Sequence, residues 1–293
     1  MTEPVWSEAL AQVKARALPA GGFGNRDGGR FRPDAAAWAI LALSIWGTGA
    51  EAAEAGRRRL AAIQGRDGRV SLAPDHPEAF WPTPLAILAW HGSPAHREAR
   101  QRAVNFLLAT GGRHWPRPAD AFHGHDTGIK GWPWTGETHS WAEPTSMAVL
   151  ALTSAEYGDH ERTREARRML LDRQLPGGGW NYGNTTVFGQ VLRPMPESTG
   201  LVLNALADAV PQREVQASLD YLAGLAPRLN TPRALGWATL GLGAWGARPP
   251  GSEARVGSCL ARQDQFGGYD TVSLALLLLA GRAAGGLASV LPA

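Results

Sequence analysis

The feature that most constrains this 293-residue chain is an internal repeat of about 49 residues, found six times. Each copy has a charged segment with helical spacing, a Gly-rich turn, and then a segment rich in Ala and Leu. The Ala/Leu segments, such as residues 147–152, are apolar on every side, so as helices they must be buried on every side. The charged segments carry a single apolar stripe, as expected of half-exposed helices.

This alternation predicts an all-α fold, namely a single (α/α)6 toroid over residues 1–293 with the apolar helices forming the inner ring. Ser, Thr, Asp and Pro at the starts of the apolar segments are typical of helix N-termini. The predicted inner helices are 34–44, 83–90, 145–152, 198–209, 234–245 and 271–280. The predicted outer helices are 7–17, 53–64, 95–109, 161–174, 213–225 and 253–263. A long insertion is expected at 110–143 and a frayed tail at 285–293.

The composition supports a large buried core and excludes several classes of protein. Hydrophobic residues make up 44% of the chain and 12 residues are Trp, whereas disordered chains are poor in aromatics. The net charge of +3 is small and scattered, so no nucleic-acid partner is expected. The lone Cys259 excludes a disulfide framework. We find no signal-peptide pattern and no apolar run of membrane-spanning length, and we therefore expect a cytoplasmic protein, with peripheral membrane contact left open.

The Gly-rich turns share one register. Residues 174–180 read QLPGGGW and residues 263–269 read QDQFGGY, while 64–70 keep the Gln and Gly and 17–23 keep the Gly and the aromatic residue. Gln at the end of a helix can reach exposed carbonyls, and Gly permits the positive φ that ends a helix. The aromatic residue would cover the turn.

This register resembles the QW repeat of squalene–hopene and oxidosqualene cyclases and the related repeat of protein prenyltransferase β subunits. The resemblance covers nearly the whole chain and implies an α/α toroid that acts on a long apolar isoprenoid in its central cavity. Prenyltransferases bind zinc through an Asp-x-Cys pair, but Gly257 stands two residues before Cys259. The resemblance therefore favours the cyclases over protein prenylation.

In class II cyclases, a D-x-D-D-T motif opens an inner helix, and its middle Asp protonates an alkene or an epoxide. The nearest match here is WAEPTSMA at residues 141–148, in which Glu143 falls where the middle Asp would be and Thr145 matches. Trp141 and Pro144 replace the flanking carboxylates. The resemblance thus implies that Glu143 is a pocket acid, although a lone Glu, with a reference pKa of ~4.3, is a weak acid for protonating an alkene.

Other acidic residues open further inner helices. Glu197 begins the helix of the next repeat, so we expect it to share a mouth with Glu143 and to assist it. Asp34 and Asp270 open the first and sixth inner helices and are candidate substrate-binding residues. The alternative is that all four compensate helix dipoles, with a cap contributing ~0.5–2 kcal/mol.

The predicted insertion is rich in His and Trp. His125 and His139 are candidate assistants of Glu143. Aromatic faces can stabilise a carbocation by ~0.5–2 kcal/mol each, and the candidate pocket-lining residues are Trp132, Trp134, Trp141 and Trp180. The alternative is an ordered loop whose Trp side chains seal the toroid. His123, His125 and Asp126 have metal-like content but no tight metal signature, so we expect neither a metal nor a cofactor.

Two further questions stay open at this level. Trp38 and Trp46, like Trp237 and Trp245, are eight residues apart, which suits either core packing or an aromatic wall around a central cavity. The chain could also be a non-catalytic toroid that binds an apolar ligand or a partner protein, or a carbohydrate-active toroid with two working carboxylates. The composition predicts no oligomeric state.

Overall fold

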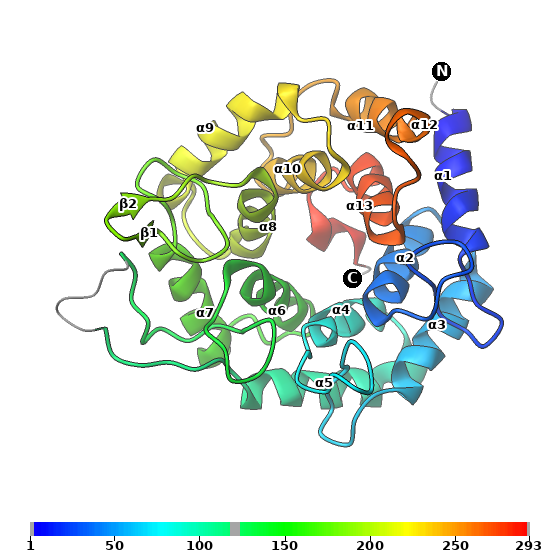
Figure 1. Cartoon of the computed structure of the whole chain (residues 1–293), viewed down its shortest axis with the longest axis horizontal. Coiled ribbons are helices and arrows are strands. Elements are labelled where there is room, and N and C mark those ends of the chain that lie inside the picture. The colour runs from blue at the N-terminus through cyan, green and yellow to red at the C-terminus, as the bar shows by residue number, and fades with distance from the viewer. Residues whose placement is uncertain (1–2, 118–123, 292–293) are drawn as a thin grey trace.

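A computed structural model describes residues 3–117 and 124–291 and shows two concentric rings of helices (Figure 1). The inner ring consists of α2 (Pro33–Ile45), α4 (Pro82–Ala89), α6 (Ala142–Ser154), α8 (Pro196–Leu206), α10 (Pro232–Ala244) and α13 (Thr271–Arg282). The outer ring consists of α1 (Glu3–Ala15), α3 (Ala50–Ala62), α5 (Arg97–Ala109), α7 (Glu161–Asp172), α9 (Gln216–Leu225) and α11 (Ser252–Leu260). Each inner helix packs on the next, and α13 packs on α2, so the ring closes. The predicted all-α toroid is confirmed.

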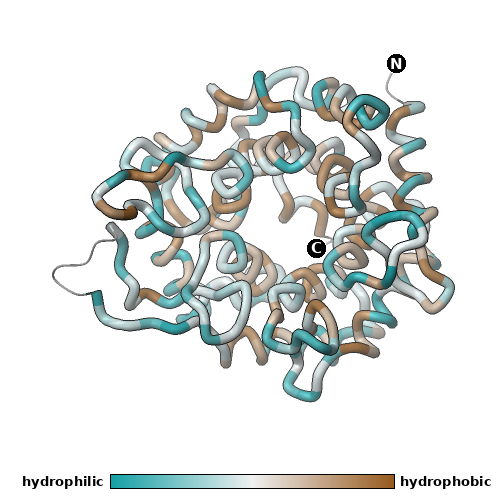
Figure 2. The backbone as a smooth tube through the Cα atoms, viewed as in Figure 1, coloured by the Kyte–Doolittle hydropathy of each residue, from teal (hydrophilic) through white to brown (hydrophobic). Residues whose placement is uncertain are grey.

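The remaining elements are short. They are α12 (Gln263–Phe266), the antiparallel strands β1 (Thr186–Val187) and β2 (Gln190–Val191), and four 3-10 turns at Pro94–His96, Gln212–Glu214, Ala226–Arg228 and Leu287–Val290. Hydrophobic stretches run along the helices, whereas the connections at the front of the ring are mostly hydrophilic (Figure 2). Within the described ranges, no helix combines the length and the apolar character needed to cross a membrane.

The inner ring is tightly packed because its helices carry small residues where they meet. Gly200 on α8 lies against the backbone of Trp237 on α10, and a Cβ at Gly200 would collide with it. Gly241 lies in turn against Gly200, where a Cβ would come 2.7 Å from the Gly200 Cα. The two helices therefore approach with almost no side chain between them, which fixes where the rest of α10 projects.

The Gln of the turn register ties one outer helix to the next. Gln64 donates hydrogen bonds from Nε2 to the carbonyls of Gly68 (2.9 Å) and Ala99 (2.8 Å), the latter on α5. Gln174 donates from Nε2 to Ser218 Oγ on α9 at 2.7 Å. The Gln side chains thus reach across the gap between neighbouring repeats.

A buried Thr in the first turn of an inner helix fixes the end of each preceding turn. Thr83, Thr145 and Thr199 each use Oγ1 to accept from an N–H and to donate to the carbonyl of the same residue. Those residues are Val70, Trp132 and Trp180, with N–H to Oγ1 distances of 2.9, 2.9 and 3.0 Å. This contact is repeated three times, although the turns themselves differ in length.

The carboxyl-terminal segment is attached to the inner ring. The sequence predicts a frayed tail at 285–293, but over residues 285–291, which the structure describes, the chain is held in place. Leu287 is buried, and its N–H donates to Asn204 Oδ1 on α8 at 2.9 Å. Figure 1 shows this segment crossing behind the centre of the ring. The buried Leu287 side chain and its satisfied amide each offset part of the entropy that is lost when this segment is ordered.

Candidate functional site

The first turns of the inner helices lie at the end of the ring where the longer connections are (Figure 1). We call the pocket among these first turns the central cavity. It is lined by Trp38, Trp81, Leu85, Trp134, Glu143, Pro144, Met147, Arg233, Trp237, Val272 and Leu276. These residues come from α2, α4, α6, α10, α13 and two connections, so five of the six inner helices contribute to it.

Four Trp side chains close the central cavity. Trp38 and Trp237 meet edge to face with ring centroids 5.6 Å apart, and Trp81 meets Trp134 in the same way at 5.5 Å. The enclosed space is about 50 Å³. One water molecule takes ~30 Å³ of liquid, and pockets for drug-sized ligands measure ~300–1,000 Å³. A long ligand therefore needs the side chains that line the cavity to move apart.

Glu143 is the carboxyl group inside this aromatic box. Burial raises the pKa of Glu143 from an ordinary 4.5 to about 7; the charge of Arg233 opposes the rise and that of Glu197 adds to it. The carboxyl group is therefore mostly protonated below neutral pH, and it can act as a hydrogen-bond donor or as a general acid.

Glu197, in the first turn of α8, lies close enough to Glu143 for its charge to raise the Glu143 pKa, although it does not itself line the central cavity. Its Oε2 is buried and has no hydrogen-bond partner among the residues that the structure describes. Burial, together with the charge of Glu197, raises the pKa of Tyr221 on α9. The structure thus brings Glu143 and Glu197 near one another and leaves one buried Glu197 oxygen without a hydrogen bond among the described residues.

Arg233 is a site residue that the sequence reasoning missed. It lines the central cavity, and its guanidinium lies 3.2 Å from Asp270 Oδ2. The signal was present, because Pro232-Arg233 on α10 stands at the register of Pro33-Asp34 on α2 and Pro196-Glu197 on α8. Aligning the starts of the inner helices would have predicted a cation among the acids.

Asp34 and Asp270 are held by protein partners. Asp34 forms a bidentate pair with Arg32 at 2.9 and 3.0 Å, and this hydrogen bonding raises the pKa of Arg32. Asp270 caps α13 by accepting the N–H of Ser273 at 2.7 Å. Burial opposes ionisation of Asp270, but the Ser273 hydrogen bonds and the charge of Arg233 together lower its pKa. Asp270 therefore caps its helix, as the alternative expected, whereas Asp34 pairs with Arg32 and makes no capping hydrogen bond; a role of either acid in binding substrate stays a prediction.

The structure places His139 beside Arg173, the residue that directly follows α7. The buried Arg173 guanidinium donates to His139 Nε2 at 3.0 Å and to the Gly183 carbonyl at 2.8 Å, and it pairs with Asp172 at 3.3 Å. Because an arginine can only donate, His139 accepts through Nε2 and is neutral. His139 also packs against the rings of His125, Trp115 and Trp141, with centroids 5.5–5.8 Å apart. This cluster fastens the insertion to the outer ring, whereas His123 lies outside the described residues.

The candidate pocket Trp residues have different surroundings. Trp134 lines the central cavity. Trp132 and Trp180 are buried between the rings, where each indole N–H donates to a carbonyl of the preceding outer helix, Leu107 at 3.1 Å and Leu170 at 2.7 Å.

The two members of each Trp pair that is spaced by eight residues lie in different parts of the structure. Trp38 and Trp237 line the cavity, whereas Trp46 and Trp245 lie at the ends of α2 and α10 and donate to carbonyls of neighbouring inner helices, Leu278 at 3.0 Å and Leu203 at 2.9 Å. One member of each pair therefore lines the cavity, and the other forms a hydrogen bond that links two neighbouring inner helices.

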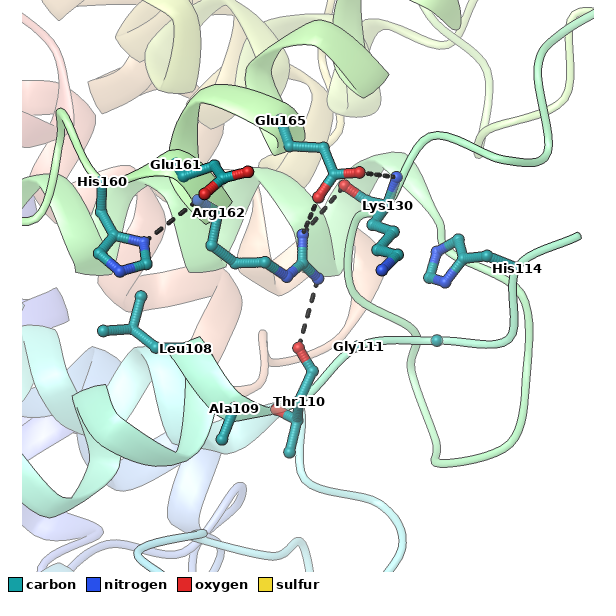
Figure 3. Close-up of a pocket in the computed structure, with 11 residues that line it drawn as sticks. Leu108, Ala109, Thr110, Gly111, His114, Lys130, His160, Glu161, Arg162 and Glu165 are labelled. Atoms are coloured by element: carbon teal, nitrogen blue, oxygen red, sulfur yellow. Dashed lines mark hydrogen bonds and ion pairs between the residues drawn. The ribbon is translucent and has the colours of Figure 1, made fainter. Parts of the chain in front are cut away.

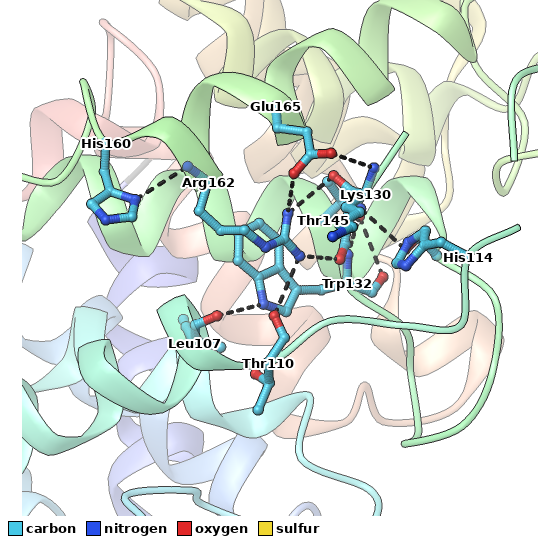
Figure 4. Close-up of polar contacts among 11 residues, drawn as sticks. Leu107, Thr110, His114, Lys130, Trp132, Thr145, His160, Arg162 and Glu165 are labelled. Carbon is cyan, nitrogen blue, oxygen red and sulfur yellow. Dashed lines mark hydrogen bonds and ion pairs between the residues drawn. The ribbon is translucent and has the colours of Figure 1, made fainter. Parts of the chain in front are cut away.

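A polar pocket of about 430 Å³ lies on the outer side of the ring, between the end of α5 and the start of α7 (Figure 3). Its central residue, Arg162, stacks 4.2 Å over the Trp132 ring and donates to the carbonyls of Thr110, Lys130 and Gly131 (Figure 4). Glu165 accepts the Lys130 N–H at 3.3 Å. The polar groups of this pocket form hydrogen bonds with one another, and these bonds hold the insertion against the outer ring.

The described residues contain no cluster of three or more His, Cys, Asp or Glu that could hold a metal ion. No protein-family model matches the sequence, and no curated protein matches it. Several solved structures, however, match this chain. A variant of the type II terpene cyclase MstE from Scytonema, in complex with geranylgeranyl dihydroxybenzoate, matches with a TM-score of 0.63 and 13% identity over 99% of this chain and 98% of that one.

The chain has the α/α-toroid fold of the type II terpene cyclases. An ent-copalyl diphosphate synthase from Streptomyces platensis matches with a TM-score of 0.54 and 20% identity, over 88% of this chain and 50% of that one. A GH76A α-1,6-mannanase from Salegentibacter matches with a TM-score of 0.60 and 10% identity, over 95% and 99%. The terpenoid cyclase-like fold is therefore shared with a carbohydrate-active enzyme.

Proposed function

We propose that the chain is a terpenoid cyclase-like enzyme that binds an apolar isoprenoid in the central cavity and protonates it through Glu143. The observation that carries this proposal is a carboxyl group with a pKa of about 7 inside a box of four Trp side chains. The shared fold supports it, since MstE was solved with a geranylgeranyl-bearing substrate. The proposal includes no metal and no cofactor.

The pKa of Glu143 suits an epoxide better than a simple alkene. A neutral carboxyl group can hydrogen-bond the epoxide oxygen and transfer its proton as the C–O bond breaks, which leaves a tertiary cation and a glutamate. The charge of Arg233 stabilises the glutamate, since it acts to lower the pKa of Glu143. The Trp faces stabilise the cation by ~0.5–2 kcal/mol each.

In this proposal Glu197 ends the reaction. Its unpaired Oε2 can accept the proton that the cation loses when a double bond forms, and proton exchange with water then returns Glu143 to the acid and Glu197 to the carboxylate. Asp34 and Asp270 act through Arg32 and Arg233, which they hold in place at the mouth. In this proposal His125 and His139 assist only by fixing the insertion that carries Trp134.

The test is to incubate the purified protein with squalene, with its terminal epoxide and with C15–C20 prenyl diphosphates, and to analyse the products by mass spectrometry. We expect a cyclised product from the wild type and from the surface variant Glu214→Gln, and none from Glu143→Gln. Unchanged substrates in every case, with a folded wild-type protein, would refute the proposal.

The closed centre favours a second candidate, a non-catalytic toroid that binds a shorter apolar ligand. In that case Glu143→Gln would keep the affinity for the ligand, whereas Leu85→Trp, which fills the cavity, would abolish it. The match to the mannanase calls for one more assay, the hydrolysis of α-mannan. In that reaction Glu143 and Glu197 would be the two carboxylates. Cytoplasmic location and peripheral membrane contact stay predictions.

A further inference from the structure

A second groove lies apart from the central cavity, between the start of α2, the end of α3 and the connection that follows α3. We call it the Arg59 groove. It encloses about 650 Å³, within the ~300–1,000 Å³ of typical ligand pockets. Most of its wall is apolar, formed by Phe31, Pro33, Ile63, Leu72, Pro74 and Pro77. A groove of this size and composition can hold an apolar chain of moderate length.

The charges in the Arg59 groove are unbalanced. Three arginines line it, against one acid, Asp67, which pairs with Arg69 at 2.7 Å. In the described ranges no carboxylate lies within ion-pair distance of Arg59 or Arg66. The Nε of Arg59 is buried and has no hydrogen-bond partner there either. A buried N–H without an acceptor is costly, and an anion in the groove that accepts from the Arg59 Nε would remove that cost.

Arg59 lies over the Phe31 ring in the absence of any ligand. Its guanidinium carbon lies 5.4 Å from the centroid of the Phe31 ring. The Phe31 ring packs directly on Gly22, where a Cβ would collide with it and would come 3.4 Å from the Arg59 Cγ. Gly22 has a φ of +81°, so the turn register provides the space that lets Phe31 support the arginine.

The opposite wall is held equally firmly. The Pro77 carbonyl accepts hydrogen bonds from Arg69 and from Ser71 Oγ, both at 2.9 Å. The Leu72 N–H donates to the Ala79 carbonyl at 2.9 Å. The connection therefore forms a closed loop that presents Leu72 and the prolines to the groove.

We propose that the Arg59 groove binds a free amphiphilic anion, an apolar molecule with a phosphate or carboxylate head. The head lies on Arg59 and Arg66, because a guanidinium donates two parallel hydrogen bonds to such a group. The tail lies along Phe31, Ile63 and Leu72. This site is independent of Glu143 and does not rest on the function proposed above.

The test uses decyl phosphate below its micelle concentration as the probe, with binding measured by isothermal titration calorimetry. Arg59→Gln should weaken binding at least tenfold and Arg66→Gln several-fold. Arg58→Gln is the matched control, since Arg58 is one residue away, 63% exposed and outside the groove. It should bind decyl phosphate like the wild type. Leu72→Ser should weaken the binding of decyl phosphate and leave that of inorganic phosphate unchanged.

Three results would overturn the proposal. The first is equal binding of decyl phosphate by the wild type and by both groove variants. The second is equal affinity for inorganic phosphate and decyl phosphate, which would indicate a simple anion site. The third is binding to phosphatidic acid vesicles but not to monomeric decyl phosphate, which would indicate a membrane surface. Circular dichroism of each variant distinguishes a loss of binding from a loss of folding. Arg66 is exposed, so Arg66→Gln should fold normally and still test the proposal if Arg59→Gln does not fold.

Discussion

The raised pKa of Glu143 predicts that the stability of the fold depends on pH, and this can be measured without a substrate. The carboxyl group has a pKa of about 7 in the folded chain and an ordinary value of 4.5. Between these values the unfolded chain has lost its proton and the folded chain has kept it, so the free energy of unfolding falls as pH rises. The loss begins near pH 4.5, ends near pH 7 and is absent at lower pH.

The size of this effect follows from the gap between the two pKa values. At ~1.4 kcal/mol per pKa unit, the gap corresponds to an upper bound of about 3 kcal/mol at pH 8. Because the Glu143 side chain keeps some solvent contact, we expect about 2 kcal/mol. The variant Glu143→Gln lacks the titration, so relative to the wild type it should gain this amount of stability between pH 4.5 and pH 8.

The assay is reversible urea unfolding followed by Trp fluorescence, at pH 4.5 to 8.5, for the wild type, Glu143→Gln and the exposed control Glu214→Gln. The difference between the wild type and Glu143→Gln should grow with pH, while the difference from the control stays flat. Parallel profiles for all three proteins would show that Glu143 titrates normally, and the argument for a protonated pocket acid would then be wrong.

Three further predictions concern the ring. Arg233→Gln removes the positive charge that acts to lower the pKa of Glu143, so the midpoint of the stability change described above should move to higher pH in the same urea series. Gly178→Ala should cost about 2–4 kcal/mol in urea unfolding, because φ is +87° and a Cβ would strike α9, whereas Gly177→Ala, with open space around it, should be nearly neutral. Trp180→Ala should cost about 3–5 kcal/mol, since it empties a fully buried site and loses a hydrogen bond, and a melting temperature within a degree or two of the wild type would contradict this.

The sequence could predict the ring because the information is local and repeated. Segments apolar on every side have no stable place except between two layers, and six of them with charged partners close a circle. The predicted helices agree with the observed ones to within a few residues at most ends. The repeat also predicts that Glu143 and Glu197 lie near one another, since equivalent first turns of parallel helices meet at one end, and in the structure the charge of Glu197 reaches Glu143.

What only the tertiary structure decided is how distant side chains change one another. The pKa of Glu143 depends on burial among side chains of other repeats, such as Trp38, Trp81 and Trp237, which no pattern around residue 143 reveals. The Arg59 groove likewise needs two separate connections side by side. Local periodicity determines helices and their buried faces, whereas the environment of a charge is set by groups far along the chain, and these come together only when the ring closes.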